Sequence, residues 1–75
     1  MKFTYEYQGI SYNATAEWST SFMTNVFRIR NLTQIFDIYP NRSGIRIRWE
    51  LYSGGELPED FLQAVGEGLE KAGIY

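Results

Sequence analysis

Residues 45–72 decide the fold, and they read IRIRWELYSGGELPEDFLQAVGEGLEKA. The first part, 45–52, alternates apolar and polar side chains, and a period of two is typical of a strand with one buried face. The glycines at 54 and 55 end this strand, and from Pro58 onward the apolar side chains recur at the spacing of an amphipathic helix. We therefore predict a strand over 45–52 and a helix over 58–72.

Two glycines, Gly66 and Gly68, lie inside the predicted helix. Each costs the helix about 0.5 to 1 kcal/mol relative to alanine, so each needs a physical reason. Close packing of the helix backbone over a bulky sheet residue such as Trp49 would supply one. A soft helix that can be remodelled is the alternative.

The chain before this stretch also has the pattern of strands. Residues 2–7 and 10–18 alternate, and two less regular apolar segments follow at 22–30 and 34–39. The sequence thus predicts an α+β fold, an antiparallel β-meander of four to five strands followed by one C-terminal amphipathic helix packed on one face of the sheet. We expect the 75 residues to form one small domain.

The third segment changes phase near Asn25, because its apolar residues fall on both faces, with Phe27 on one and Val26 on the other. An extra residue in a strand turns all later side chains to the opposite face. We therefore predict a β-bulge or bend near Asn25, and we expect the polar residues 19–21 to end the strand before it.

One helix is too small to cover a flat sheet of this size. Five strands make a sheet roughly 24 Å wide, whereas a helix is about 10 Å across. The rest must be covered by curling of the sheet into a partial barrel, by a second subunit or by a binding partner. Thirteen aromatic residues are available to fill the core or to serve one of these uses.

The composition excludes most familiar catalytic chemistry. The chain has no Cys and no His, so disulfides, thiolate zinc sites and Ser/His/Asp relays are excluded. We expect no enzymatic activity and no catalytic, cofactor-binding or metal-binding residues. No signal segment or membrane-spanning apolar run is visible, so we expect a cytoplasmic protein without a membrane partner.

The distribution of arginines along the chain indicates a binding surface. The net charge is −2, yet all five arginines lie between positions 28 and 48. Strand alternation places Arg28 and Arg30 on one side of the third strand and Arg46 and Arg48 on one side of the fifth, so they form two rows, with Arg42 in the turn between. Asp37 lies between the two arginine rows, so a solvated ladder of opposite charges is the simplest interpretation. The candidate partner-binding residues are Arg28, Arg30, Tyr39, Arg42, Arg46, Arg48 and Tyr52, because arginine and tyrosine are enriched at protein interfaces.

The leading hypothesis is a small protein-protein interaction module, accessory or inhibitor-like and of a kind found in bacteria and phages. It would bind a partner protein with an acidic surface through an exposed sheet face. One alternative is a single-stranded nucleic-acid or RNA-associated module that uses the arginine face. A second alternative is a self-associating subunit that forms a homodimer.

Overall fold

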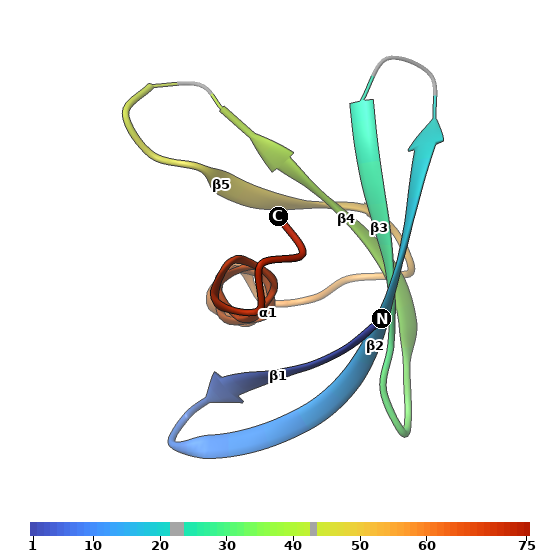
Figure 1. Cartoon of the computed structure of the whole chain (residues 1–75), viewed down its shortest axis with the longest axis vertical. Helices are drawn as coiled ribbons and strands as arrows, with labels where there is room; N and C mark the ends of the chain where they lie inside the picture. Colours follow the sequence, from blue (N-terminus) through green and yellow to red (C-terminus); the bar gives the residue numbers. More distant parts are fainter. Residues whose placement is uncertain (22–23, 43) are drawn as a thin grey trace.

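A computed structural model describes residues 1–21, 24–42 and 44–75 of the chain. Its elements are β1 (Lys2–Tyr7), β2 (Ile10–Ser21), β3 (Thr24–Arg30), β4 (Ile35–Asn41), β5 (Arg48–Ser53) and α1 (Glu59–Lys71). The five strands form one antiparallel sheet in chain order, and α1 packs on it (Figure 1). The predicted α+β meander with a C-terminal helix is confirmed.

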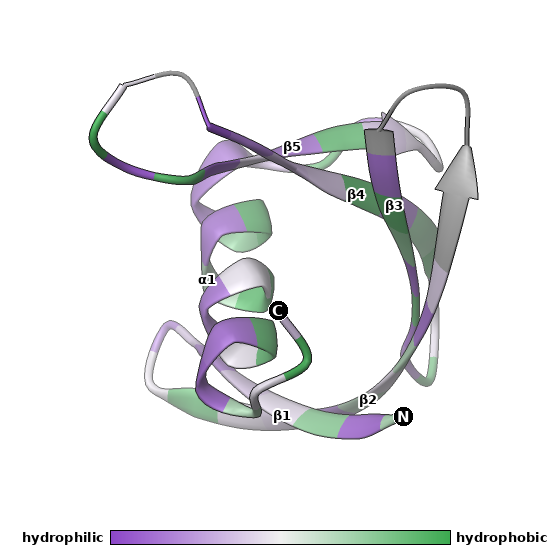
Figure 2. Ribbon diagram, turned by 45° about the horizontal axis from the view of Figure 1, so that its top comes forward, coloured by the Kyte–Doolittle hydropathy of each residue, from purple (hydrophilic) through white to green (hydrophobic). Residues whose placement is uncertain are grey.

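The sheet curls around α1 (Figure 1). The helix contacts β1 and β5, the two edges of the sheet, and it fills the gap between them. Figure 2 shows the hydrophobic side of α1 turned toward the concave face of the sheet and its hydrophilic side turned outward. Curling into a partial barrel is therefore how one helix covers this sheet. In the described part of the chain, no helix has the length and apolar character needed to cross a membrane.

The core lies between the concave face of the sheet and α1. Alternate residues of each strand point into it, as a period of two requires. Its buried members are Phe3, Tyr5, Ala14, Ala16, Phe27, Ile29, Phe36, Ile38, Trp49, Phe61, Leu62, Val65 and Leu69.

The two helical glycines let α1 approach the sheet closely. A Cβ atom at Gly66 would lie 2.1 Å from Cδ1 of Trp49, and one at Gly68 would lie 2.5 Å from the carbonyl oxygen of Thr4. Real Cβ atoms essentially never come this close to another heavy atom. The packing interpretation of these glycines, with Trp49 as the residue beneath the helix, is confirmed.

Trp49 also ties β5 to α1 through hydrogen bonds. Its backbone N–H donates to Oε1 of Gln63 (3.0 Å), and Nε2 of Gln63 donates to its carbonyl oxygen (2.7 Å). The Gln63 amide thus satisfies two backbone groups of an edge strand, as a neighbouring strand would. The indole Nε1 donates to Oε2 of Glu70 at 3.1 Å.

Three predicted strand limits are wrong. β4 runs to Asn41 and not to Tyr39, because Pro40 and Asn41 pair with Trp49 and Arg48 of β5. β2 continues through residues 19–21, with Ser21 paired to Thr24, because the ladder to β3 holds these polar residues in the strand. β5 begins at Arg48 and not at Ile45. Alternation predicts which face of a strand a residue lies on, but a strand also needs a paired neighbour. The ladder between β4 and β5 ends at Asn41 and Arg48, so the residues before Arg48 are not in the strand. Residues 22 and 23 of the predicted third strand lie outside the described residues.

The predicted bulge is also misplaced. The pairing of β2 with β3 is continuous from Thr24 to Arg30, so no bulge occurs near Asn25 in this stretch. The register shift lies between β4 and β5, where Asp37 pairs with Ser53 and Ile38 with Leu51. Tyr52 is passed over, which turns Ser53 toward the outer, convex face of the sheet.

Candidate functional site

Four polar side chains form a row across the convex face of the sheet. Register places Glu17, Arg28, Asp37 and Ser53 side by side on β2, β3, β4 and β5. Arg28 donates from Nε to Oδ1 of Asp37 (2.9 Å) and from Nη2 to Oδ2 (3.3 Å), and Ser53 Oγ donates to Oδ2 (2.8 Å). Asp37 has Arg28 on one side and Ser53 on the other. The expectation that two arginine rows flank it is wrong, because the register pairs Arg48 with Asn41, four residues further along β4, and places Ser53 opposite Asp37.

The other arginines do not complete a second row. Arg30 forms a 3.6 Å ion pair with Glu17, and Arg48 forms an ion pair with Glu59 of α1. Arg46 precedes β5 and makes no ion pair with any described residue. The arginines are therefore spread over separate contacts and do not make one continuous basic face.

The remaining predicted residues lie in two further places. Arg42 donates from Nε to the Tyr75 hydroxyl at 2.6 Å, and its guanidinium lies 5.1 Å from the centre of that ring. Tyr39 and Tyr52 meet edge to face on the convex side, with their centroids 6.2 Å apart. Partner binding by any of the seven predicted residues stays a prediction.

The Asp37 carboxylate makes the stability of the fold depend on pH. The Arg28 hydrogen bond holds the pKa of Asp37 below its ordinary value; burial opposes this, and the Ser53 hydrogen bond adds to it. A carboxylate of this kind stabilises the fold above its unfolded pKa, about 3.9. That stabilisation is lost as pH falls through the folded-state pKa.

We expect Asp37→Asn to lower the free energy of unfolding by about 1 to 2 kcal/mol at neutral pH, since Arg28 is half exposed and its bond is weakened by water. The difference from wild type should shrink as pH falls from about 5 to about 2. Urea denaturation over this range measures it. A difference between the two proteins that stays constant with pH would contradict the assignment.

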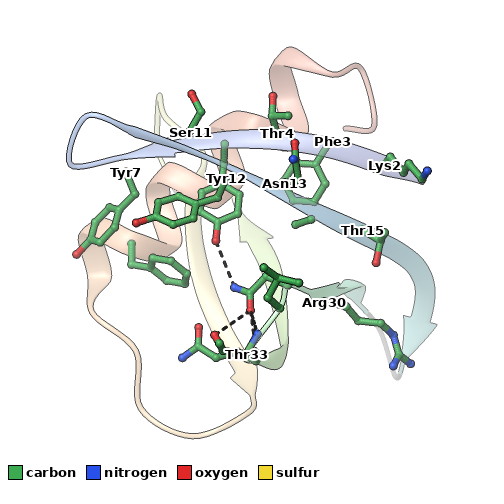
Figure 3. Close-up of a pocket in the computed structure, with 16 residues that line it drawn as sticks. Lys2, Phe3, Thr4, Tyr7, Ser11, Tyr12, Asn13, Thr15, Arg30 and Thr33 are labelled. Atoms are coloured by element: carbon green, nitrogen blue, oxygen red, sulfur yellow. Dashed lines mark hydrogen bonds between the residues drawn. The ribbon is translucent and has the colours of Figure 1, made fainter.

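The molecule also has a groove of about 1160 Å³. It lies between the β1–β2 hairpin and the loop that joins β3 to β4 (Figure 3). Its lining residues are Lys2, Phe3, Thr4, Tyr5, Tyr7, Ser11, Tyr12, Asn13, Ala14, Thr15, Arg30, Asn31, Leu32, Thr33, Gln34 and Phe61.

Aromatic rings form one part of this groove. Tyr12 stacks on Tyr5, with centroids 5.3 Å apart and planes 21° apart. Phe61 of α1 meets Tyr5 and Tyr7 edge to face at 5.8 and 5.2 Å. Tyr5 and Phe61 are buried, whereas Tyr12 is 39% exposed. The groove therefore has a fixed aromatic floor and an accessible aromatic side chain.

The opposite wall is a loop held by Asn31. Its Oδ1 accepts hydrogen bonds from the backbone N–H groups of Thr33 (3.0 Å) and Gln34 (2.8 Å), an Asx turn. Its Nδ2 donates to the Tyr5 hydroxyl at 3.3 Å. This arrangement projects Leu32 fully into solvent, with a relative exposure of 102%.

A carboxylate lies just outside the groove. The Tyr7 hydroxyl is 3.3 Å from both oxygens of Asp60. Burial, followed by the Asp60 charge, raises the pKa of Tyr7, and the one proton of this hydroxyl is donated to Asp60. The described residues that line the groove include no carboxylate, which leaves aromatic, amide, hydroxyl and cationic groups to contact a ligand.

Of the described residues that line the groove, only Arg30 was among the partner-binding residues predicted from the sequence. Alternation places Tyr5 and Tyr7 on one face of the first strand, and in the structure Tyr5 pairs with Tyr12 of β2 on the face that contacts Phe61 of α1. Their partial exposure depends on where the curled sheet ends. The surplus of aromatic residues is the one sequence signal that points to such a surface.

No family model, curated protein or solved structure matches this chain.

Proposed function

We propose that the protein is a small non-enzymatic binding module that holds an extended segment of a partner protein in the aromatic groove. The observation that carries this proposal is the combination of a preformed floor with accessible apolar groups. Tyr12, Leu32 and Ile10 are all at least 39% exposed, and exposed tyrosine and aliphatic groups beside a concavity are typical of binding sites.

The size of the groove supports a chain segment as the occupant. Pockets for small molecules hold roughly 300 to 1000 Å³, and this groove is larger and open. The convex face supports binding less well, since Arg28 and Arg48 already face carboxylates and Arg42 is held by Tyr75. The proposal therefore moves the binding surface from the arginines to the groove.

Two fully exposed aliphatic residues give a matched test. Leu32 lines the groove, whereas Ile45 lies outside it with an exposure of 104%. Neither Leu32→Asp nor Ile45→Asp removes a core contact, so we expect both variants to melt within a few degrees of wild type.

The probe is a set of 12-residue peptides selected from a random display library on the immobilised protein, with affinities measured by fluorescence anisotropy. Burying a leucine side chain contributes about 1.5 to 3 kcal/mol, so Leu32→Asp should weaken binding at least about tenfold. Ile45→Asp should leave it unchanged. Peptides that bind equally well to Leu32→Asp would overturn the proposal.

The same pair of variants tests self-association. Sedimentation of the wild type should show a monomer, because curling has already covered the concave face of the sheet. A dimer that Leu32→Asp dissociates would assign the groove to a second copy of the chain instead.

A further inference from the structure

The two ends of the groove differ in charge. Thr15 pairs with Lys2 on one side and with Arg30 on the other, so these three residues form a row across β1, β2 and β3. Figure 3 shows Lys2, Thr15 and Arg30 at one end and Tyr7 at the other. Lys2 and Arg30 are the charged residues among those described as lining the groove, and both are positive.

These two cations are available to a ligand. Lys2 is exposed and makes no ion pair with a described residue. Arg30 faces Glu17 at 3.6 Å, but both side chains are about half exposed or more, and such surface pairs contribute only about 0 to 1 kcal/mol. A ligand carboxylate can therefore replace Glu17 at small cost.

We infer that the segment bound in the groove is acidic, with an aromatic or aliphatic anchor at the tyrosine end and one or more carboxylates at the Lys2–Arg30 end. This inference rests on the proposed function. Lys2 and Tyr7 are the first and last residues of β1. Their Cα atoms are about 16 Å apart at the rise of a strand, and because they are an odd number of positions apart their side chains leave the strand on opposite faces. An extended segment would place its carboxylates about three to five residues from its anchor.

The geometry favours a peptide over single-stranded nucleic acid. Two phosphate contacts would give a salt slope of only about −1.4, too little for stable binding without more cations. The other arginines nearest in sequence, Arg28 and Arg42, are held by Asp37 and Tyr75. An acidic segment needs only its anchor and one or two favourable charge contacts.

The selected peptides test this inference directly. We expect an excess of Asp and Glu three to five positions from an aromatic or aliphatic residue. The double variant Lys2→Gln/Arg30→Gln should bind these peptides about tenfold more weakly at about 50 mM salt, and raising the salt should reduce wild-type affinity similarly. Arg46→Gln is the matched control, since Arg46 is exposed, makes no ion pair with a described residue and lies outside the groove.

The outcomes separate this inference from the proposed function. Selected peptides that lack an excess of acidic residues but still depend on Leu32 for binding would overturn the inference of an acidic segment. The proposal of a binding module would then still hold. Absence of any Leu32-dependent peptide would overturn both. A fluorescein-labelled oligothymidine that binds more tightly than the peptides, and that is lost in the double variant, would assign the basic end to nucleic acid instead.

Discussion

Gly66→Ala should destabilise the protein by about 1 to 2 kcal/mol, even though alanine is the better helix former. Helix propensity alone would stabilise the variant by about 0.5 to 1 kcal/mol. The new Cβ atom would lie 2.1 Å from Cδ1 of Trp49, in a ring that is buried and has no room to move aside. Overpacking a close-packed core costs about 1 to 3 kcal/mol or more, so the clash exceeds the gain in propensity.

Urea denaturation of the wild type and the variant gives the sign of this effect. Ala64→Gly in the same helix is the control, because it measures the propensity difference near this site, which should be at most about 1 kcal/mol. A Gly66→Ala protein as stable as wild type, or more stable, would show that α1 does not lie against Trp49 as described.

The alternation of polar and apolar residues predicted much of the fold. β1 has the predicted bounds, and α1 lies within one residue of the prediction at each end. Both segments could be predicted from the local sequence alone. The residues of β1 alternate regularly, and Pro58 marks the start of α1. The close approach of α1 to the sheet could also be predicted. Gly66 and Gly68 weaken a helix, so they are expected inside one only where close packing requires them.

Register and pairing were not readable in the same way. The register shift that places Ser53 opposite Asp37 depends on the pairing of β5 with β4. No residue type in either strand indicates it. Residues 45–47 alternate as well as those that follow, but they lie beyond the last pair of this ladder. A pattern along one chain segment does not reveal where its neighbour stops.

Most of the candidate site, apart from Arg30, was missed for a related reason. Alternation groups Tyr12 with the residues on one face of its strand, but its exposure depends on the curvature of the sheet and on the loop opposite. The arginines were expected to act together because they share a face. Their partners come instead from register and from distant segments, as with Glu59 for Arg48 and Tyr75 for Arg42.

Trp49→Ala should have the largest effect of any single substitution in the core. Trp49 is 1% exposed, and its ring meets Phe27 and Tyr75 edge to face at 5.9 and 5.3 Å. It also carries the hydrogen bond to Glu70. Truncating such a side chain costs about 3 to 5 kcal/mol, whereas a domain of this size has about 4 to 11 kcal/mol in total. We expect a protein that is largely unfolded or close to it.

The second tryptophan is the control for this prediction. Trp18 is 55% exposed and lies outside the core cluster, so Trp18→Ala should cost less than about 1 kcal/mol. Equal losses for the two variants would contradict the placement of Trp49. Where Trp49→Ala does not fold, Trp49→Leu keeps an apolar side chain and allows a double-mutant cycle with Gly66→Ala. The cost of Gly66→Ala should fall by at least about 1 kcal/mol in the Trp49→Leu background, because the ring atoms with which the new Cβ clashes are absent there.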